Sequence, residues 1–184
     1  MSPPGPGSQL GLAGTTAADG SPLLLWSAFD GSDDEILWSR RDVNGWSKPS
    51  RIGADNATPD ILPSIARHGG GALAAWSRYD GNDYRVVVAR LDGARWTAPV
   101  AIGPKGSYDA ALGAAPSGPA AVVFRSAAGW EARELDRRGD PTRRRAAIPD
   151  PPDDDDRAVI ESVGAKGLTV RWRSSGATTT VGWR

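Results

Sequence analysis

The chain contains 184 residues, and its 22 lysines and arginines are balanced by 22 aspartates and glutamates, so its formal charge is zero. This balance removes the overall electrostatic attraction that would favour nucleic acid or an anionic membrane as a partner. The chain has no cysteine, which excludes disulfides, zinc–thiolate sites and a cysteine nucleophile.

Residues 1–8 read MSPPGPGS and are predicted to form a linker rich in proline and glycine. They lack the basic start and the apolar stretch of a signal peptide. No apolar run approaches the roughly 18 residues that a membrane-spanning helix needs. We therefore expect no signal peptide and no membrane span in this chain. The absence of cysteine fits several compartments, of which the cell envelope or the extracellular space is favoured.

The first predicted unit follows the linker as four short segments of strand length, residues 9–17, 21–29, 35–40 and 46–52. Turn residues separate these segments, as in Asp19-Gly20 and in residues 30–33. Short strands separated by turns at intervals of about ten residues are typical of an all-β protein.

A second unit repeats the first. Residues 31–53 align without a gap with residues 81–103, and the preceding Trp26-Ser27 aligns with Trp76-Ser77. The aligned stretches share Gly31/Gly81, Asp33/Asp83, Arg40/Arg90, Trp46/Trp96, Pro49/Pro99, Ile52/Ile102 and Gly53/Gly103. The strands expected in this unit are residues 62–67, 72–79, 84–91 and 96–102. A repeat of this period indicates a repeat architecture before any local propensity is considered.

Two further units are less regular. The third is predicted to contain strands at residues 110–115, 119–125, 130–135 and 143–148, and the fourth contains strands at residues 158–163, 167–173 and 178–184. A large aromatic residue ends the second strand of every unit: Trp26, Trp76, Phe124 and Trp172, spaced by 50, 48 and 48 residues. The fourth unit has no fourth strand.

Four antiparallel strands per unit, repeated around an axis, describe the blades of a β-propeller. One small sheet cannot cover both its faces, so blades bury them by packing on one another. We predict a single all-β propeller domain over residues 9–184, with blades at about 9–53, 60–103, 108–149 and 157–184. The four repeated aromatic residues are predicted to be core, and burial of each removes on the order of 200 Å² from water.

The turn between the third and fourth strands resembles a degenerate Asp-box, the Ser-x-Asp-x-Gly-x-x-Trp motif of sialidase-like (BNR-repeat) propellers. Ser39 and Trp46 match the motif in the first unit, and Gly93 and Trp96 match it in the second. The resemblance covers nearly the whole chain after the linker. It implies a propeller fold, and in that family the box is a structural turn that does not by itself imply catalysis.

Sialidase-like propellers usually have six blades, whereas this chain holds fewer than four complete units. A closed ring of four blades, with the last blade three-stranded or completed by the N-terminal segment, is the favoured arrangement. The alternatives are a part-propeller that self-associates as a homo-oligomer to complete a ring, or a part of a longer protein.

Trp46 and Trp96 stand at the start of the fourth strand in two successive units. The favoured interpretation is an aromatic residue that closes its own turn. The functional alternative is a repeated carbohydrate pocket, in which the ring stacks on a sugar while neighbouring polar groups bind hydroxyls, with avidity from repetition. The polar residues of these two pockets would be Asp42 and Asn44 in the first unit, and Asp92 and Arg95 in the second.

Other polar groups have simpler structural explanations. The turns at residues 30–33 and 80–83 could offer carboxylates to Ca²⁺, but aspartate, asparagine and glycine are also the ordinary residues of tight turns, so no metal site is assigned. His68 is predicted to be a solvated turn residue, and residues 153–156 a solvated acidic linker. No catalytic residue and no cofactor are assigned.

These observations favour a non-enzymatic binding or scaffold module that recognises a glycan or a protein, in the manner of a lectin and in a bacterial envelope or secreted setting. The alternative is a sialidase-like glycoside hydrolase or a fragment of one. An enzyme is disfavoured because the arginine cluster, nucleophile pair and acid/base carboxylate of a sialidase cannot be placed on these units.

Overall fold

The computed structural model describes residues 9–54, 56–115 and 118–184, and the predicted N-terminal linker lies outside them. The described residues form strands, turns and bends without any helix, so none of them belongs to a helix long and apolar enough to cross a membrane. The strands are β1 (Gln9–Thr16), β2 (Pro22–Phe29), β3 (Asp34–Asp42), β4 (Gly45–Trp46), β5 (Ser50–Arg51), β6 (Asp60–His68), β7 (Gly71–Tyr79), β8 (Tyr84–Asp92), β9 (Arg95–Trp96), β10 (Val100–Ala101), β11 (Tyr108–Ala114), β12 (Ala120–Ser126), β13 (Gly129–Leu135), β14 (Pro141–Ile148), β15 (Ala158–Gly164), β16 (Gly167–Trp172) and β17 (Thr178–Gly182).

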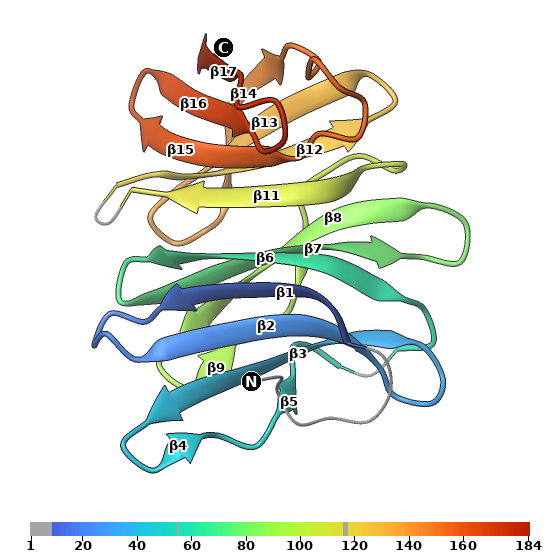
Figure 1. Cartoon of the computed structure of the whole chain (residues 1–184), viewed down its shortest axis with the longest axis vertical. Coiled ribbons are helices and arrows are strands. Elements are labelled where there is room, and N and C mark those ends of the chain that lie inside the picture. The colour runs from blue at the N-terminus through green and yellow to red at the C-terminus, as the bar shows by residue number, and fades with distance from the viewer. Residues whose placement is uncertain (1–8, 55, 116–117) are drawn as a thin grey trace.

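The strands form four antiparallel sheets in chain order, which we call blades 1 to 4: β1–β5, β6–β10, β11–β14 and β15–β17. Neighbouring strands within a blade are joined by short turns. The blades stack face to face in a single row, with blade 1 at one end and blade 4 at the other (Figure 1). This confirms the predicted all-β, propeller-type architecture.

The row of blades does not close into a ring. The first strands of the blades lie side by side in the order β1, β6, β11 and β15, and β1 and β15 are at opposite ends of the row (Figure 1). The favoured closed ring of four blades is therefore not what the chain forms, and the structure corresponds to the alternative of a part-propeller. Closure depends on the angle between successive sheets, which the spacing of the repeats does not determine.

Three hydrophobic layers hold the row together, one between each pair of successive blades. Leu23, Leu25 and Ile36 of blade 1 pack against Trp76 of blade 2. Phe124 occupies the same position between blades 2 and 3, and Trp172 does so between blades 3 and 4. Each aromatic ring thus faces the preceding blade, because its strand position is the same in each unit. Trp26 has no such partner sheet, and although it is buried it belongs to none of these three layers.

The serine after the repeated tryptophan links blade 1 to blade 2 and blade 2 to blade 3. The Ser27 hydroxyl donates to the backbone oxygen of Asp60 at 3.0 Å, and the Ser77 hydroxyl accepts from the backbone N–H of Asp109 at 3.1 Å. Both serines are buried. In blade 2 the Trp-Ser pair therefore supplies an apolar contact to blade 1 through Trp76 and a hydrogen bond to blade 3 through Ser77.

The predicted fourth strands of blades 1 and 2 are each split into two short pieces. In blade 1 the pieces are β4 and β5, which both pair with β3, and in blade 2 they are β9 and β10, which both pair with β8. Pro49 and Pro99 lie in the interruptions. A proline has no N–H to donate to the sheet and is tolerated at an edge where pairing stops.

The outward face of blade 4 is polar. The Thr169 and Thr180 hydroxyls are 3.0 Å apart, and Arg171 donates to Glu161 at 2.8 Å. The last residue, Arg184, exchanges backbone hydrogen bonds with Arg145 of β14, so the end of the chain is attached to blade 3.

Gly71 is expected to be required at the start of β7. A Cβ atom at this position would lie 2.0 Å from the backbone oxygen of Leu91 in β8, whereas a Cβ at the adjacent Gly70 would meet no atom within 4 Å. We expect Gly71→Ala to lower the free energy of unfolding by about 1–3 kcal/mol through overpacking, and Gly70→Ala to change it by less than about 0.5 kcal/mol. Urea denaturation of the two variants checks this, and equal effects would contradict it.

Candidate functional site

The inner strands of all four blades line one groove. It has a volume of about 500 Å³ and is bounded by residues 11–14 of β1, 62–65 of β6, 109–112 of β11 and 157–160 around the start of β15, with Arg173 beside them. These segments lie along the same side of the row (Figure 1). Most of the lining residues have apolar side chains or are glycine, and the charged groups in the lining are Asp109, Arg157 and Arg173.

A bulge interrupts each inner strand, and in blades 1 to 3 it lies opposite the repeated aromatic residue. The pairing register shifts between Leu10 and Ala13, between Ile61 and Ser64, between Tyr108 and Ala111, and between Ile160 and Ser162. In three blades the bulge holds a residue with positive φ: Gly11 at 63°, Leu62 at 56° and Asp109 at 55°. Such a conformation is unfavourable for residues other than glycine. The bulge thus re-aims side chains in the groove, and in blade 3 the side chain at this position is a carboxylate.

Asp109 is a partly buried acid that faces arginines. Its side chain is 23% exposed, and its Oδ1 lies 4.0 Å from Nη1 of Arg157. Burial raises the pKa of Asp109, while the positive charges of Arg157 and Arg125 oppose this effect. The Arg157 side chain is 56% exposed, so its guanidinium remains available to a ligand in the groove.

Asp156 fixes the backbone of the two segments that carry the groove arginines, Arg157 and Arg173. Its carboxylate accepts hydrogen bonds from the backbone N–H groups of Arg157, Ser174 and Ser175 and from the Ser175 hydroxyl, at 2.6 to 3.0 Å. Burial acts to raise the pKa of Asp156, but these four hydrogen bonds outweigh it and lower the pKa to about 2. In addition, the Arg173 N–H donates to the Arg157 backbone oxygen at 2.9 Å. The segment bearing both arginines is thereby fixed.

Two sequence predictions about polar residues are wrong. Residues 153–155 are exposed, but Asp156 is buried, because the adjacent turn of blade 4 supplies hydrogen-bond donors that the sequence does not reveal. His68 is also buried, with Nε2 3.1 Å from the backbone oxygen of Asp136. It is not a solvated turn residue because blade 3 packs over the end of its strand.

The structure places the residues of the predicted carbohydrate pockets on outer hairpins, away from the inner-strand groove. Trp96 packs edge-on against Trp38 of blade 1, with ring centroids 5.9 Å apart. Trp46, at the same position in blade 1, is 37% exposed. The two tryptophans therefore have different surroundings, because Trp96 has a preceding blade to pack on and Trp46 does not.

The polar residues of those pockets mainly bond within their own hairpins. Asp42 accepts from the backbone N–H of Asn44 at 2.7 Å, and Asp92 lies 3.3 Å from Arg90. Asn44 and Arg95 are exposed. Asp42 lines a shallow depression with residues 19–22 and 40–43, but Trp46 and Asn44 are not among its lining residues. A glycan pocket at either tryptophan remains a prediction.

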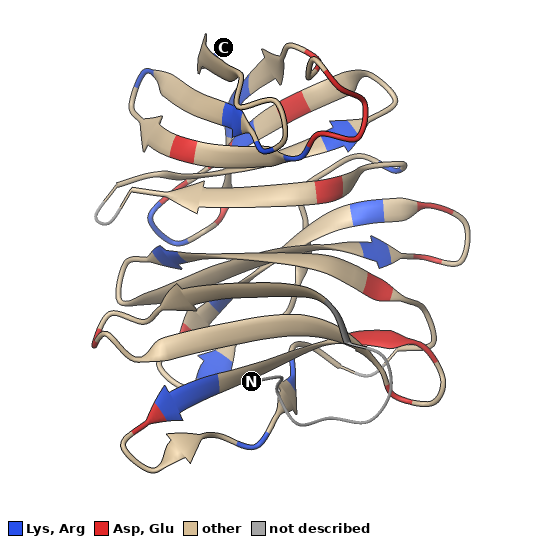
Figure 2. Ribbon diagram, viewed as in Figure 1, with Lys and Arg blue, Asp and Glu red and all other residues tan. Residues whose placement is uncertain are grey.

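Charge is spread over the whole molecule. Figure 2 shows both signs distributed over all four blades, with the acidic loop next to the start of β15. Three acids gather at the β2–β3 turn, where oxygens of Asp30, Asp33 and Glu35 lie within 4.8 Å of one another. This cluster shares no residue with the groove lining and forms a second candidate site.

No protein-family model and no curated protein sequence matches the chain. Solved structures do match. A Dyadobacter fermentans protein of unknown function has a TM-score of 0.67 at 16% identity, over 92% of this chain and 51% of that one. An alpha-L-arabinofuranosidase from Lactobacillus brevis has a TM-score of 0.59 at 11% identity, over 91% of this chain and 66% of that one. A Hadza microbial sialidase has a TM-score of 0.55 at 16% identity, over 96% of this chain and 46% of that one.

The chain thus spans about half to two-thirds of the length of these structures. Because their sequence identity to this chain is low, the similarity concerns the fold alone. It shows that this chain has a propeller-type fold.

Proposed function

We propose that the chain is a non-enzymatic binding module whose inner-strand groove takes an acidic saccharide. The observation that carries this proposal is the pair of arginines, Arg157 and Arg173, at one side of a groove that all four blades line. Asp156 binds the backbone of Arg157 and Ser174, and the Arg173 N–H binds the Arg157 backbone oxygen, so the backbone that carries both arginines is fixed. Guanidinium groups are suited to bind a carboxylate through paired hydrogen bonds. The groove volume of about 500 Å³ leaves room for sugar rings.

A carbohydrate is preferred to other anions because of the proteins that share the fold. They include structures named as an alpha-L-arabinofuranosidase, a sialidase and a polysaccharide lyase. The similarity is in fold alone, so the ligand is part of the proposal. The acidic class is inferred from the two arginines of this chain.

Binding is preferred to hydrolysis because of the acids in the groove. Most glycoside hydrolases need two carboxyl groups that flank the scissile bond. Among the described residues that line this groove, Asp109 is the single carboxylic acid. Asp109 nevertheless favours the alternative, a sialidase-like hydrolase or a fragment of one, because burial raises its pKa as a general acid requires.

Calorimetric titration with sialic acid and with oligogalacturonides, against neutral arabino-oligosaccharides, tests the proposal. We expect the acidic sugars to bind. We expect Arg157→Ala and Arg173→Ala each to weaken binding about tenfold or more, since a hydrogen bond to a charged group contributes about 1.5–3 kcal/mol. Arg95→Ala, an exposed arginine on an outer hairpin, serves as the matched control and is expected to leave affinity unchanged.

Two other results would redirect the assignment. If Trp46→Ala and Trp96→Ala abolish binding while the groove variants do not, the ligand occupies the outer hairpins. If the chain hydrolyses a chromogenic sialoside or arabinofuranoside and Asp109→Asn abolishes that activity, the hydrolase alternative is correct. Absence of binding to every acidic sugar would contradict the groove proposal.

A further inference from the structure

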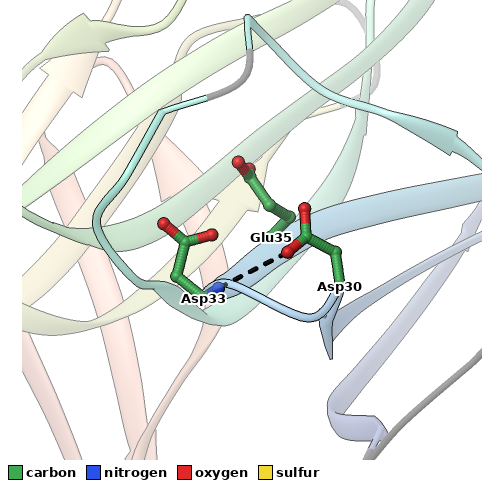
Figure 3. A group of neighbouring side chains, drawn as sticks. All are labelled: Asp30, Asp33 and Glu35. Carbon is green, nitrogen blue, oxygen red and sulfur yellow. Dashed lines mark hydrogen bonds between the residues drawn. The ribbon is translucent and has the colours of Figure 1, made fainter.

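Three carboxylates converge at the turn between β2 and β3 of blade 1. Asp30 and Asp33 belong to the turn and Glu35 begins the buried part of β3, and one oxygen from each lies within 4.8 Å of the other two. Figure 3 shows the three carboxylates gathered on one side of the turn. Ca²⁺ binds oxygen ligands at about 2.3–2.6 Å, so ligands across a single ion are separated by at most about 5 Å. The spacing of these oxygens is that of ligands to one ion.

Glu35 contributes an oxygen that has no hydrogen-bond partner among the described residues. Its side chain is completely buried. Oε1 accepts weak hydrogen bonds from the backbone and side-chain nitrogens of Asn56, at 3.4 and 3.5 Å. Oε2 has no hydrogen-bond donor among the described residues. A buried carboxylate oxygen without a partner is unfavourable, and its position beside two further carboxylates is that of an unfilled ligand atom.

The carboxylates at this turn are close enough to repel one another. Arg51 contacts two of them, with Nη2 2.9 Å from Asp30 Oδ2 and Nη1 3.5 Å from Glu35 Oε1. Burial and the neighbouring acids Asp60 and Asp33 raise the pKa of Glu35 to about 7, although Asn56 and Arg51 act to lower it. A divalent cation held between the three carboxylates would relieve this repulsion.

The same turn in blade 2 provides an internal comparison. Asp80 and Asp83 occupy the positions of Asp30 and Asp33, and in both turns the first aspartate accepts backbone hydrogen bonds from the residues two and three positions later. At the position of Glu35, however, blade 2 has Arg85. Lys105 also approaches Asp80, at 3.9 Å. Blade 2 thus supplies positive side chains where blade 1 supplies a third carboxylate.

We propose that the β2–β3 turn of blade 1 is a Ca²⁺ site with Asp30, Asp33 and Glu35 as ligands. All three supply hard oxygen atoms, which suit Ca²⁺, whereas transition metals prefer nitrogen or sulfur ligands. Glu35 also contacts Asn56 in the connection from β5 to β6. A bound ion would therefore tie the turn of blade 1 to the segment that leads into blade 2. This site departs from the sequence interpretation, which assigned no metal.

The test uses the full chain after removal of metal with EDTA. Terbium is added and its luminescence is excited through tryptophan, and the melting temperature is recorded with and without 5 mM CaCl2. We expect sensitised terbium emission that Ca²⁺ displaces, and a rise of several degrees in melting temperature with Ca²⁺ that Mg²⁺ reproduces poorly. Glu35→Gln and Asp33→Asn are expected to reduce terbium affinity at least tenfold and to abolish the shift.

Asp83→Asn, the matched change in blade 2, is expected to retain both responses. Glu35→Gln preserves the volume of the side chain, and circular dichroism verifies that it is folded; Asp33→Asn gives the same information should Glu35→Gln fail to fold. The proposal is overturned if the wild-type chain shows neither terbium emission nor a Ca²⁺-dependent shift. It is equally overturned if Glu35→Gln and Asp33→Asn respond as the wild type does.

Discussion

Replacing Trp76 by alanine is expected to lower the free energy of unfolding by about 3–5 kcal/mol, the range found for large aromatic residues in cores. Trp76 is completely buried between blades 1 and 2, and its indole N–H has no acceptor among the described residues. The ring therefore contributes through apolar contact, and its removal leaves a cavity between the two sheets. Urea denaturation followed by circular dichroism measures the loss.

Trp46→Ala is the matched control for this experiment. Trp46 aligns with Trp96 in the repeat, is 37% exposed, and lies on a two-residue strand at the edge of blade 1. We expect its replacement to cost less than about 1 kcal/mol. Equal losses for Trp46→Ala and Trp76→Ala would show that the repeated second-strand aromatic is not the principal contact between blades.

Arg78→Ala is expected to lower the free energy of unfolding by about 3 kcal/mol. Arg78 donates two hydrogen bonds to Asp60, at 2.9 and 2.6 Å. Asp60 is completely buried, whereas the Arg78 side chain is 27% exposed. Removing one member of such a pair leaves a buried carboxylate without its counter-charge, which costs about 3–5 kcal/mol. The guanidinium also lies 5.7 Å from the centre of the Trp76 ring, so it packs on the aromatic residue between blades.

A double-mutant cycle separates the ion pair from the packing. Asp60→Ala and Arg78→Ala are measured singly and together, and we expect a coupling energy above 1 kcal/mol, as contacting residues in one network show. Arg40→Ala supplies a control, because Arg40 pairs with the exposed Asp19 at the surface, where ion pairs contribute at most about 1 kcal/mol. A coupling near zero would contradict the assigned role of the pair.

The repeat correctly predicted an all-β, propeller-type architecture. Trp76, Phe124 and Trp172 recur because a blade must cover both faces, and this physical reason is visible in the sequence. The strand positions followed from turn residues between short apolar segments. The Trp-Ser dipeptide also recurs visibly in the sequence. The hydrogen bond that Ser27 or Ser77 makes with the next blade depends on the geometry between blades, which a single sequence does not show.

The groove was missed for a related reason. Its walls are mostly apolar residues of the inner strands, which carry no motif. Arg157 and Arg173 lie in the least regular unit, and their relation depends on Asp156, which reads as part of an acidic run. The bulge that carries Asp109 is a pairing irregularity, without a residue signature that distinguishes it from Gly11 or Leu62. Trp46 and Trp96 attracted attention because repetition and aromatic character are visible in sequence, whereas concavity is not.

At the acidic turn between β2 and β3, unlike the groove, the sequence did contain a signal. The alignment of the two units already contained the difference between Glu35 and Arg85. What the sequence lacked was the burial of Glu35 and the absence of a partner for its second oxygen. A comparison of repeats for changes of charge sign, rather than for identities alone, would have drawn attention to this position.

Four blades form an open row whose inner strands line one groove, and a distance between spin labels tests this arrangement directly. The chain has no natural cysteine, so spin labels can be placed at single introduced cysteines. The distance between labels on Thr16 of β1 and Ser162 of β15 is measured by double electron–electron resonance in protein diluted with unlabelled chain. A label pair on Thr16 and Arg67, on the adjacent strands β1 and β6, provides the reference. The open row predicts a clearly longer distance between labels on Thr16 and Ser162 than between those of the reference pair. Equal distances would mean that β1 and β15 are neighbours in a closed ring and would contradict the open arrangement.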